Sequence, residues 1–147
     1  MTNLDRRGYC GVGIVGAKTP ANLGTLWRSA ALMEASFIFT IGKRWPKQGS
    51  DTVKAWRHIP LYEYDTLDDF KVPNDCSLVA VEQTSRSRDV RDFKHPERAI
   101  YLLGAEDRGV PQDLLKRADS VVEIPSERCL NVAVAGSIIL YDRLAKT

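Results

Sequence analysis

Two apolar segments near the end of the chain each run into a tight loop that leads into a helical pattern. The first is AIYLLGAEDRG at 99–109, and the second is VEIPSERCLNVAVAGSIILYDRLAK at 122–146. Glycine or proline marks each loop. Two such loops, close together in sequence, can form one pocket from backbone amides and carbonyls with few charges of its own. The pair therefore predicts a site for a neutral-faced ligand of nucleoside size.

Strand-like and helix-like patterns alternate along the whole chain. This alternation predicts an α/β fold, with a mostly parallel sheet flanked by helices on both faces. Parallel sheets of this kind bind ligands beyond the carboxyl ends of their strands, where both late loops are expected. Strands are expected at 9–15, 37–41, 77–81, 99–103 and 121–124, helices at 23–33, 67–72, 111–117 and 131–144, and longer loops at 16–24, 43–58 and 83–96.

Length and composition limit the class of protein. The 147 residues are expected to form a single domain, 1–147. A net charge of +2 gives no global basic field of the kind that announces a nucleic-acid-binding protein. The three cysteines are odd in number and share no metal-ligand spacing, which favours reduced thiols in a cytoplasmic protein and no metal site. No apolar run reaches the ~18 residues needed to cross a bilayer.

A first polar motif, NLGTLWR, follows the first expected strand. Asn22 is expected to cap a helix, and Arg28 lies six residues later, about one and a half turns along it. Both side chains could reach one ligand from the start of the helix, where anions are favoured. Taken alone, the segment fits a capped helix with a solvated arginine better than a binding site.

The second motif is LGAEDRG at 103–109. Gly104 can bring the end of a strand against a flat ligand, Glu106 projects from the loop, and Gly109 suits a positive φ. A well-formed turn with exposed charges explains these residues equally well. The motif lacks the three-glycine spacing of a dinucleotide-binding fingerprint.

The third motif is IPSERCLN at 124–131. Pro125 fixes the exit of a strand, and Asn131 lies where a helix N-cap belongs. Cys129 could act as a nucleophile if His58 or His95 served as its base, and a Cys–His hydrolase is therefore a minor alternative.

Basic and aromatic residues are interleaved in the loop at 43–58. Cations bind phosphates, and indole rings stack on unpaired bases, so this loop favours contact with RNA. The alternative is a solvated loop whose tryptophans pack back onto the core. The residues expected to contact RNA are Lys43, Arg44 and Trp45, with Arg86 from a second basic run.

Together and in this order, the motifs resemble those of the TrmH-type (SpoU) RNA ribose 2′-O-methyltransferases of the SPOUT superfamily. NLGTLWR is similar to the family's first motif, LLGAEDRGVP to its second, and IPSERCLNVAVAGSIILYD to its third. The sequence VEQT at 81–84 also recurs in some members. The resemblance covers essentially the whole chain, which looks like a minimal catalytic domain without a separate RNA-binding domain.

The resemblance implies several properties beyond the residue patterns. It implies a deep trefoil knot at the C-terminal end, although knots are nearly absent from proteins. It implies a homodimer that binds S-adenosylmethionine in the knot loops and methylates the ribose of a tRNA or an rRNA. The implied catalytic residues are Arg28, Asn22, Glu106 and Asn131, and the implied cofactor-binding residues are Gln83, Gly104, Ile124, Leu130 and Ala133.

Cys129 departs from the family pattern, which usually has serine at this position. A thiol is a weak hydrogen-bond donor, so a role of that hydroxyl would be weakened here. Two alternatives therefore stay open beside ribose methylation. One is methylation of an RNA base by the same fold, and the other is a catalytically silent RNA-binding dimer.

Overall fold

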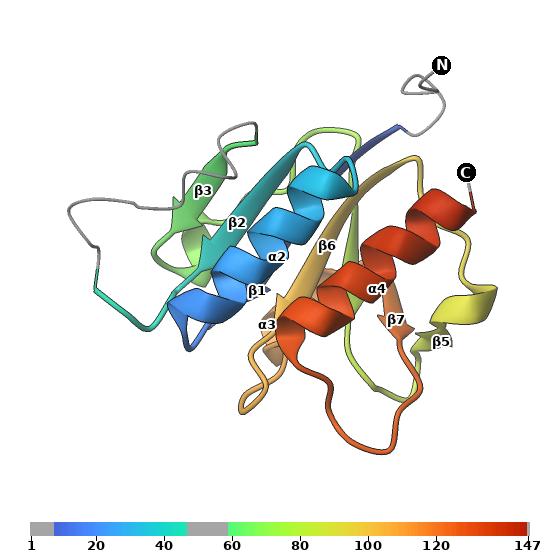
Figure 1. The fold of residues 1–147 in the computed structure, drawn as a ribbon. Coiled ribbons are helices and arrows are strands. Elements are labelled where there is room, and N and C mark those ends of the chain that lie inside the picture. The colour runs from blue at the N-terminus through green and yellow to red at the C-terminus, as the bar shows by residue number, and fades with distance from the viewer. Residues whose placement is uncertain (1–7, 47–58, 147) are drawn as a thin grey trace.

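Seven parallel strands form one sheet in the computed structural model, which describes residues 8–46 and 59–146. The strand order is β3-β2-β1-β6-β4-β7-β5. The chain builds one half of the sheet with β1 to β3 and the other half with β4 to β7 (Figure 1). The strands are β1 (Tyr9–Val15), β2 (Phe37–Ile41), β3 (Leu61–Tyr64), β4 (Ser77–Val81), β5 (Arg88–Asp89), β6 (Arg98–Gly104) and β7 (Ser120–Glu123).

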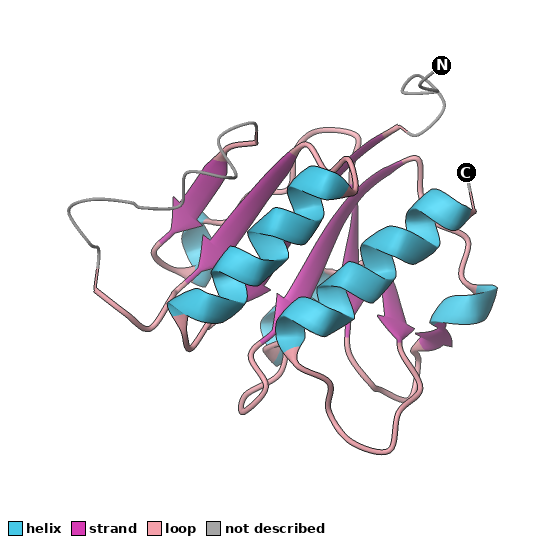
Figure 2. Cartoon of the chain, in the orientation of Figure 1, coloured by secondary structure: helices cyan, strands magenta, loops and turns pink. Residues whose placement is uncertain are grey.

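Helices cover both faces of the sheet, as predicted. On one face, α2 (Pro20–Leu32) and α4 (Val132–Ala145) lie side by side, and Leu26 and Ile139 are buried there (Figures 1 and 2). On the other face, α3 (Gln112–Arg117) buries Leu114 and Leu115 against a second apolar cluster. Two 3-10 turns, η2 (Leu67–Asp69) and η3 (Val90–Asp92), complete the elements. The predicted α/β class is thus confirmed.

The central strand β6 leads directly into the first of the two late loops, at the carboxyl end of the sheet. All seven of its residues pair with β1, and Ile100, Tyr101 and Leu102 are fully buried. A strand covered on both faces needs a continuous apolar run rather than an alternating one, and RAIYLLG supplies it. The loops that follow β1, β4, β6 and β7 consequently meet at one edge of the sheet.

Several predicted boundaries were wrong. Helix α2 begins at Pro20, three residues before the expected start at 23, because proline is favoured in a first helical turn. Thr19 therefore occupies the N-cap position, and Asn22 lies inside the helix. Strand β3 was missed, and the expected loop at 83–96 contains β5 and η3. The expected helix at 67–72 is only the 3-10 turn η2.

No helix in the described part of the chain is long and apolar enough to span a membrane.

Candidate active site

A pocket opens at the carboxyl ends of β4, β6 and β7. It lies between the loop that follows β6 and the long loop that connects β7 to α4. Apolar side chains from both loops and from the strand ends form much of its wall. Its lining residues are Val81, Glu82, Gln83, Leu103, Gly104, Ala105, Glu106, Gly109, Glu123, Ile124, Ser126, Cys129, Leu130, Val132 and Ala135.

Four of the five residues expected to bind a cofactor line this pocket: Gln83, Gly104, Ile124 and Leu130. The fifth, Ala133, lies outside it. Ala133 is 1% exposed, and it lines a different, shallow hollow between α2 and α4. The structure therefore places the two late loops around one pocket, and it turns the first residues of α4 partly away from it.

Gly104 allows the β6 loop to fold back on its own strand. A Cβ atom at this position would lie 2.1 Å from the carbonyl carbon of Gly109 and 2.4 Å from the Val110 nitrogen. The predicted reason for this glycine was close approach to a ligand, whereas the close approach observed is to the returning chain. Gly109 has the expected positive φ, +68°, and its N–H donates to the Ala105 carbonyl at 2.7 Å.

Glu82 supports the floor of the pocket and was not predicted as a site residue. Its Oε2 accepts a hydrogen bond from the Val110 N–H at 3.0 Å, and its Oε1 accepts one from the Gln83 N–H at 3.1 Å. The carboxylate thus links the end of β4 to the β6 loop. An acidic residue directly after a buried strand, within VEQT, was the available signal.

Three of the four expected catalytic residues meet in one hydrogen-bonded cluster. Asn131 Nδ2 donates to Asn22 Oδ1 at 2.9 Å, and Asn22 Nδ2 lies 3.5 Å from Glu106 Oε1. The same Glu106 oxygen accepts from the Val132 N–H at 3.3 Å. Asn131 also caps α4 as predicted, because its Oδ1 accepts from the amides of Ala133 and Val134. Each of the three sequence motifs therefore contributes one residue to this cluster.

Arg28 lies farther along α2, with its side chain exposed to solvent. It is six residues beyond Asn22, so it projects from a different face of the helix. Its part in catalysis stays a prediction.

A second hollow adjoins the first and opens toward the start of α2. It is lined by Ile14, Ala17, Lys18, Thr19, Asn22, Ala105, Glu106, Asp107 and Val132. Glu106 lines both hollows. A ligand in the first pocket and a second molecule in this cleft would therefore meet beside Glu106 and Asn22.

The residues expected to contact RNA are engaged within the protein. Lys43 pairs with Glu63 at 2.8 Å, and Trp45 is partly buried against the core. The Arg86 guanidinium donates to the carbonyls of Leu115 and Ala118 at the end of α3. RNA contact by these side chains stays a prediction. The remainder of the basic loop, 47–58, with Lys47, Lys54, Trp56, Arg57 and His58, lies outside the described residues.

Arg44 joins two loops that line the second hollow. Its guanidinium forms a two-pronged pair with Asp107, at 2.6 and 2.9 Å, and its Nε donates to the Gly16 carbonyl at 2.9 Å. This pairing lowers the pKa of the Asp107 carboxyl to about 2, chiefly through the hydrogen bonds from Arg44. Asp107 is consequently ionised at every pH at which the protein would work.

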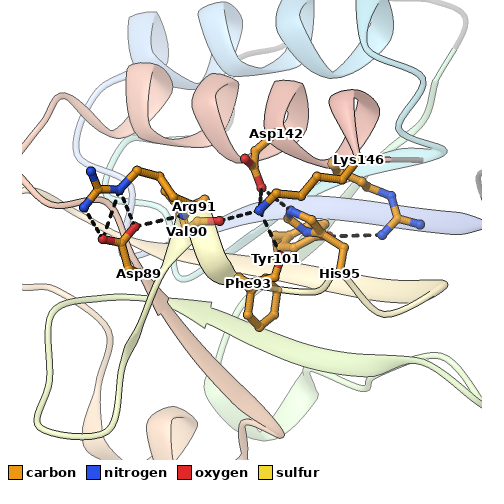
Figure 3. A network of polar contacts seen from close by, with 9 residues as sticks. Asp89, Val90, Arg91, Phe93, His95, Tyr101, Asp142 and Lys146 are labelled. Atoms are coloured by element: carbon orange, nitrogen blue, oxygen red, sulfur yellow. Dashed lines mark hydrogen bonds and ion pairs between the residues drawn. The ribbon is translucent and has the colours of Figure 1, made fainter.

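A catalytic pair of Cys129 and His95 is excluded by the fold. Cys129 lines the pocket, whereas His95 precedes β6 and is buried between Tyr101 and Asp142 (Figure 3). His95 contacts Asp142, which lies eleven residues beyond the N-cap Asn131, or about 16 Å along α4 at about 1.5 Å per residue, whereas Cys129 precedes that N-cap. The hydrolase alternative with His95 as base was therefore wrong.

Within 8–46 and 59–146, no group of three or more histidine, cysteine and acidic side chains is placed to bind a metal ion.

Most of the exposed apolar side chains gather on the paired helices. Of five large hydrophobic residues described as exposed, four lie on α2 or α4: Leu32, Val134, Ile138 and Tyr141. The three on α4 follow a spacing of four and three residues, which places them on one helical face. At the start of this face, the Val134 N–H donates to Asn131 Oδ1.

The fold and the site together define a parallel α/β domain with a ligand pocket at the carboxyl ends of its strands and a polar cluster at the mouth of that pocket. The chain belongs to the SpoU rRNA Methylase family, whose model matches residues 11–141. The family resemblance expected from the three motifs is thus confirmed.

Relatives of known name extend this comparison. The chain is 31% identical over 136 residues to a mouse tRNA (guanosine(18)-2′-O)-methyltransferase. The aligned region covers 84% of this chain and 8% of that enzyme. It is 30% identical over 138 residues to a tRNA (cytidine(34)-2′-O)-methyltransferase of Beijerinckia indica, covering 85% of this chain and 84% of that enzyme. The chain thus spans less than a tenth of the first relative and most of the second.

A solved structure has the same fold. The AdoMet-bound rRNA methyltransferase of Sinorhizobium meliloti superposes with a TM-score of 0.81 at 27% identity. The match covers 95% of this chain and 57% of that one.

Proposed function

We propose that this domain transfers a methyl group from S-adenosylmethionine to a ribose 2′-hydroxyl of a tRNA or an rRNA. The observation that carries the proposal is the hydrogen-bonded cluster of Asn22, Glu106 and Asn131 at the junction of two hollows. Family membership supports it, since the mouse relative and the B. indica relative are both named tRNA 2′-O-methyltransferases.

The chemistry of the first pocket fits S-adenosylmethionine. Val81, Leu103 and Ile124 provide apolar surface for an adenine ring. The carboxylates of Glu106 and Glu123 at the lining complement the positive charges of the sulfonium and the ammonium. The similar S. meliloti protein is named as an AdoMet-bound structure, which supports the same ligand here.

When bound, the cofactor would supply a methyl group on a positively charged sulfur and leave as the neutral thioether, so the protein has to align the acceptor hydroxyl, whose proton passes to solvent. Asn22 and Asn131 would orient the ribose through their amides, because each is fixed by the other. A guanidinium is a poor general base, so we assign Arg28 a binding role. It would bind the RNA phosphate next to the reacting ribose and thereby position the hydroxyl.

A homodimer is part of the same proposal. The exposed apolar face of α2 and α4 gives a surface that a second copy would cover, and single exposed apolar side chains rarely gather in this way without a partner. Arg28 also lies exposed on α2. In the proposed dimer, Arg28 of one subunit would lie near the cofactor pocket of the other. The domain is proposed to be sufficient for catalysis in this dimer, in the cytoplasm.

The proposal also includes a trefoil knot formed by the C-terminal segment. Its support is the path of the chain after β7, since the loop at 124–131 and the loop after β6 line one pocket before α4 returns to pack beside α2. The knot would fix both loops around the cofactor.

Transfer to RNA can be measured directly. The protein is incubated with isotope-labelled S-adenosylmethionine and either unmodified tRNA transcripts or deproteinised rRNA, and the RNA is digested to nucleosides for mass spectrometry. Labelled 2′-O-methylnucleosides are expected. Label on a base would instead indicate a base methyltransferase. Binding of cofactor and RNA without any transfer would indicate the silent RNA-binding dimer.

A further inference from the structure

Arg44 contacts two loops that are far apart in sequence and that both line the second hollow. Its backbone N–H donates to the Ala17 carbonyl at 2.9 Å, and its Nε donates to the Gly16 carbonyl at 2.9 Å. Its two terminal nitrogens donate to the carboxylate of Asp107. One side chain therefore spans from the loop after β1 to the loop after β6.

The two walls that Arg44 joins carry the catalytic cluster. The loop after β1 leads directly into α2 and Asn22, and Asp107 is the neighbour of Glu106. A shift of either loop would change the distance between Asn22 and Glu106, which is already at the 3.5 Å limit of a hydrogen bond. Displacement of a reacting group by about 1 Å can cost on the order of 100-fold in rate.

The planar fork of arginine suits this task and lysine does not. Two parallel N–H bonds to a carboxylate fix an angle as well as a distance, whereas an ammonium provides a point charge. The Arg44 side chain is 21% exposed and that of Asp107 is 42% exposed. Pairs with this exposure add little to overall stability, so the value of this pair lies in geometry.

We propose that Arg44 is a positioning residue that fixes the width of the cleft beside Glu106, rather than a residue that binds RNA phosphate. This inference rests on the proposed function for its effect on catalysis. It replaces the sequence-based expectation of an RNA contact with a contact inside the protein.

Kinetics and RNA binding separate the two roles. Arg44→Ala and Arg44→Lys are compared with the unaltered protein for methylation of tRNA transcripts, and for binding of a fluorescent tRNA transcript at several salt concentrations. For a positioning residue, kcat falls about 10- to 100-fold in both variants, while KM for RNA and the salt slope of binding stay unchanged. A phosphate contact would instead lower the salt slope by about 0.9 in Arg44→Ala, and Arg44→Lys would restore it. That result would overturn the proposal.

A double-mutant cycle and a matched control variant test the ion pair itself. Asp107→Asn is expected to lower kcat as Arg44→Ala does, and the double variant to be no worse than either single one, because both remove one interaction. Arg91→Ala breaks a comparable Arg–Asp pair, with Asp89, that lies in neither wall of the cleft. It should leave kcat unchanged. Additive losses in the double variant would contradict the role of the pair.

A measurement without catalysis keeps the inference separate from the proposed function. In hydrogen–deuterium exchange, Arg44→Ala should increase exchange in the peptides that contain 15–19 and 104–111, and Arg91→Ala should not. If these peptides are unaffected, Arg44 does not position the loops, whether or not methyl transfer occurs. If they are affected and no RNA is methylated, the proposed function fails while the positioning role remains.

Discussion

Asn131 Nδ2 donates to Asn22 Oδ1 across 2.9 Å and joins two residues that are 109 positions apart. The same Asn131 side chain caps α4 through its oxygen. One amide therefore has two separate tasks: its acceptor oxygen stabilises a helix, and its donor nitrogen orients a residue of the candidate active site.

Asn131→Asp separates these tasks. Aspartate keeps the oxygen that caps α4, so the free energy of unfolding should change by less than about 0.5 kcal/mol. It loses the N–H that binds Asn22 and places a second carboxylate beside Glu106, so methyl transfer should fall at least about 10-fold. Urea unfolding and the transfer assay measure the two effects.

Asn131→Ala is the matched variant, since it removes both tasks. It should lose the methyl-transfer activity and also about 1 kcal/mol of stability. An Asn131→Asp variant with full activity would show that the contact with Asn22 has no part in catalysis.

Arg28→Ala should abolish methyl transfer while leaving the affinity for S-adenosylmethionine unchanged. Arg28 is exposed on α2 and lines neither hollow, so its removal should not disturb the cofactor pocket. Calorimetry measures cofactor binding, and the transfer assay measures activity. Arg28→Lys tests for planar recognition of phosphate, because lysine keeps the charge and loses the fork. Full activity of Arg28→Ala would refute the proposed role.

Gly104→Ala should destabilise the pocket. The added Cβ would lie 2.1 Å from the carbonyl carbon of Gly109 and 2.4 Å from the nitrogen of Val110, whose N–H is held by Glu82. Overpacking of this kind costs about 1–3 kcal/mol, and cofactor affinity should fall with it.

Gly24→Ala is the control for this substitution. Gly24 lies within α2, and a Cβ there meets no atom within 4 Å. Since alanine favours a helix interior over glycine, this variant should gain about 0.5–1 kcal/mol of stability. Thermal unfolding of both variants gives the comparison. Equal stability of Gly104→Ala and the unaltered protein would show that the β6 loop can move aside.

The residues of the site were more predictable from the sequence than their geometric roles. Asn131 was placed correctly because an N-cap is a local property, decided by a few neighbouring residues. Asn22 was assigned the same role by the same rule, and there the rule failed because Pro20 starts the helix two residues earlier. The contact of Asn22 with Asn131 depends on tertiary packing, which no local pattern encodes.

Long-range contacts and weak local patterns explain what else the sequence did not reveal. Arg44 looks like a phosphate-binding residue in a basic loop, and its partner Asp107 is 63 positions away. Gly104 looks like a ligand-contacting glycine, and the chain it contacts is its own loop. Strand β3 was missed because its four residues alternate weakly and two of them are exposed at the edge of the sheet.

The exposed face of α4 gives a prediction about assembly. Ile138→Asp places a charge in the middle of the apolar row formed with Val134 and Tyr141, so the proposed dimer should dissociate. Sedimentation velocity should then show a monomer, and methyl transfer should be lost with the second subunit. Tyr62→Asp alters an apolar residue that is 49% exposed on β3, away from both helices, and should leave the association state unchanged. A dimer that persists in Ile138→Asp would place the interface elsewhere.

His95 connects the end of α4 to β6 at the edge of the sheet opposite the pocket. Its side chain is 3% exposed, with Nε2 2.6 Å from Asp142 Oδ2 and Nδ1 2.6 Å from the Tyr101 hydroxyl (Figure 3). The Tyr101 oxygen also accepts a hydrogen bond from Arg143, and Lys146 pairs with Asp142. A neutral imidazole satisfies every partner, because it donates to the carboxylate and accepts the tyrosine proton.

Burial lowers the pKa of His95 below its usual value of 6.5, and the nearby cations of Arg143 and Lys146 add to this, while Asp142 opposes it. Above pH 6.5, neither the folded nor the unfolded state carries a proton on this ring, so stability is at its full value. Below pH 6.5, the unfolded chain binds the proton first. The free energy of unfolding should therefore decrease as the pH is lowered below 6.5, by at most about 1.4 kcal/mol per pH unit for this one group.

Urea unfolding between pH 5 and 8 measures this dependence. His95→Gln should reduce the slope below pH 6.5, since glutamine does not titrate, although it lowers stability at all pH values by disturbing the contacts with Tyr101 and Asp142. His58→Gln, which removes the other histidine of the chain, is measured beside it for comparison. A slope that survives in His95→Gln would assign the pH dependence to other groups.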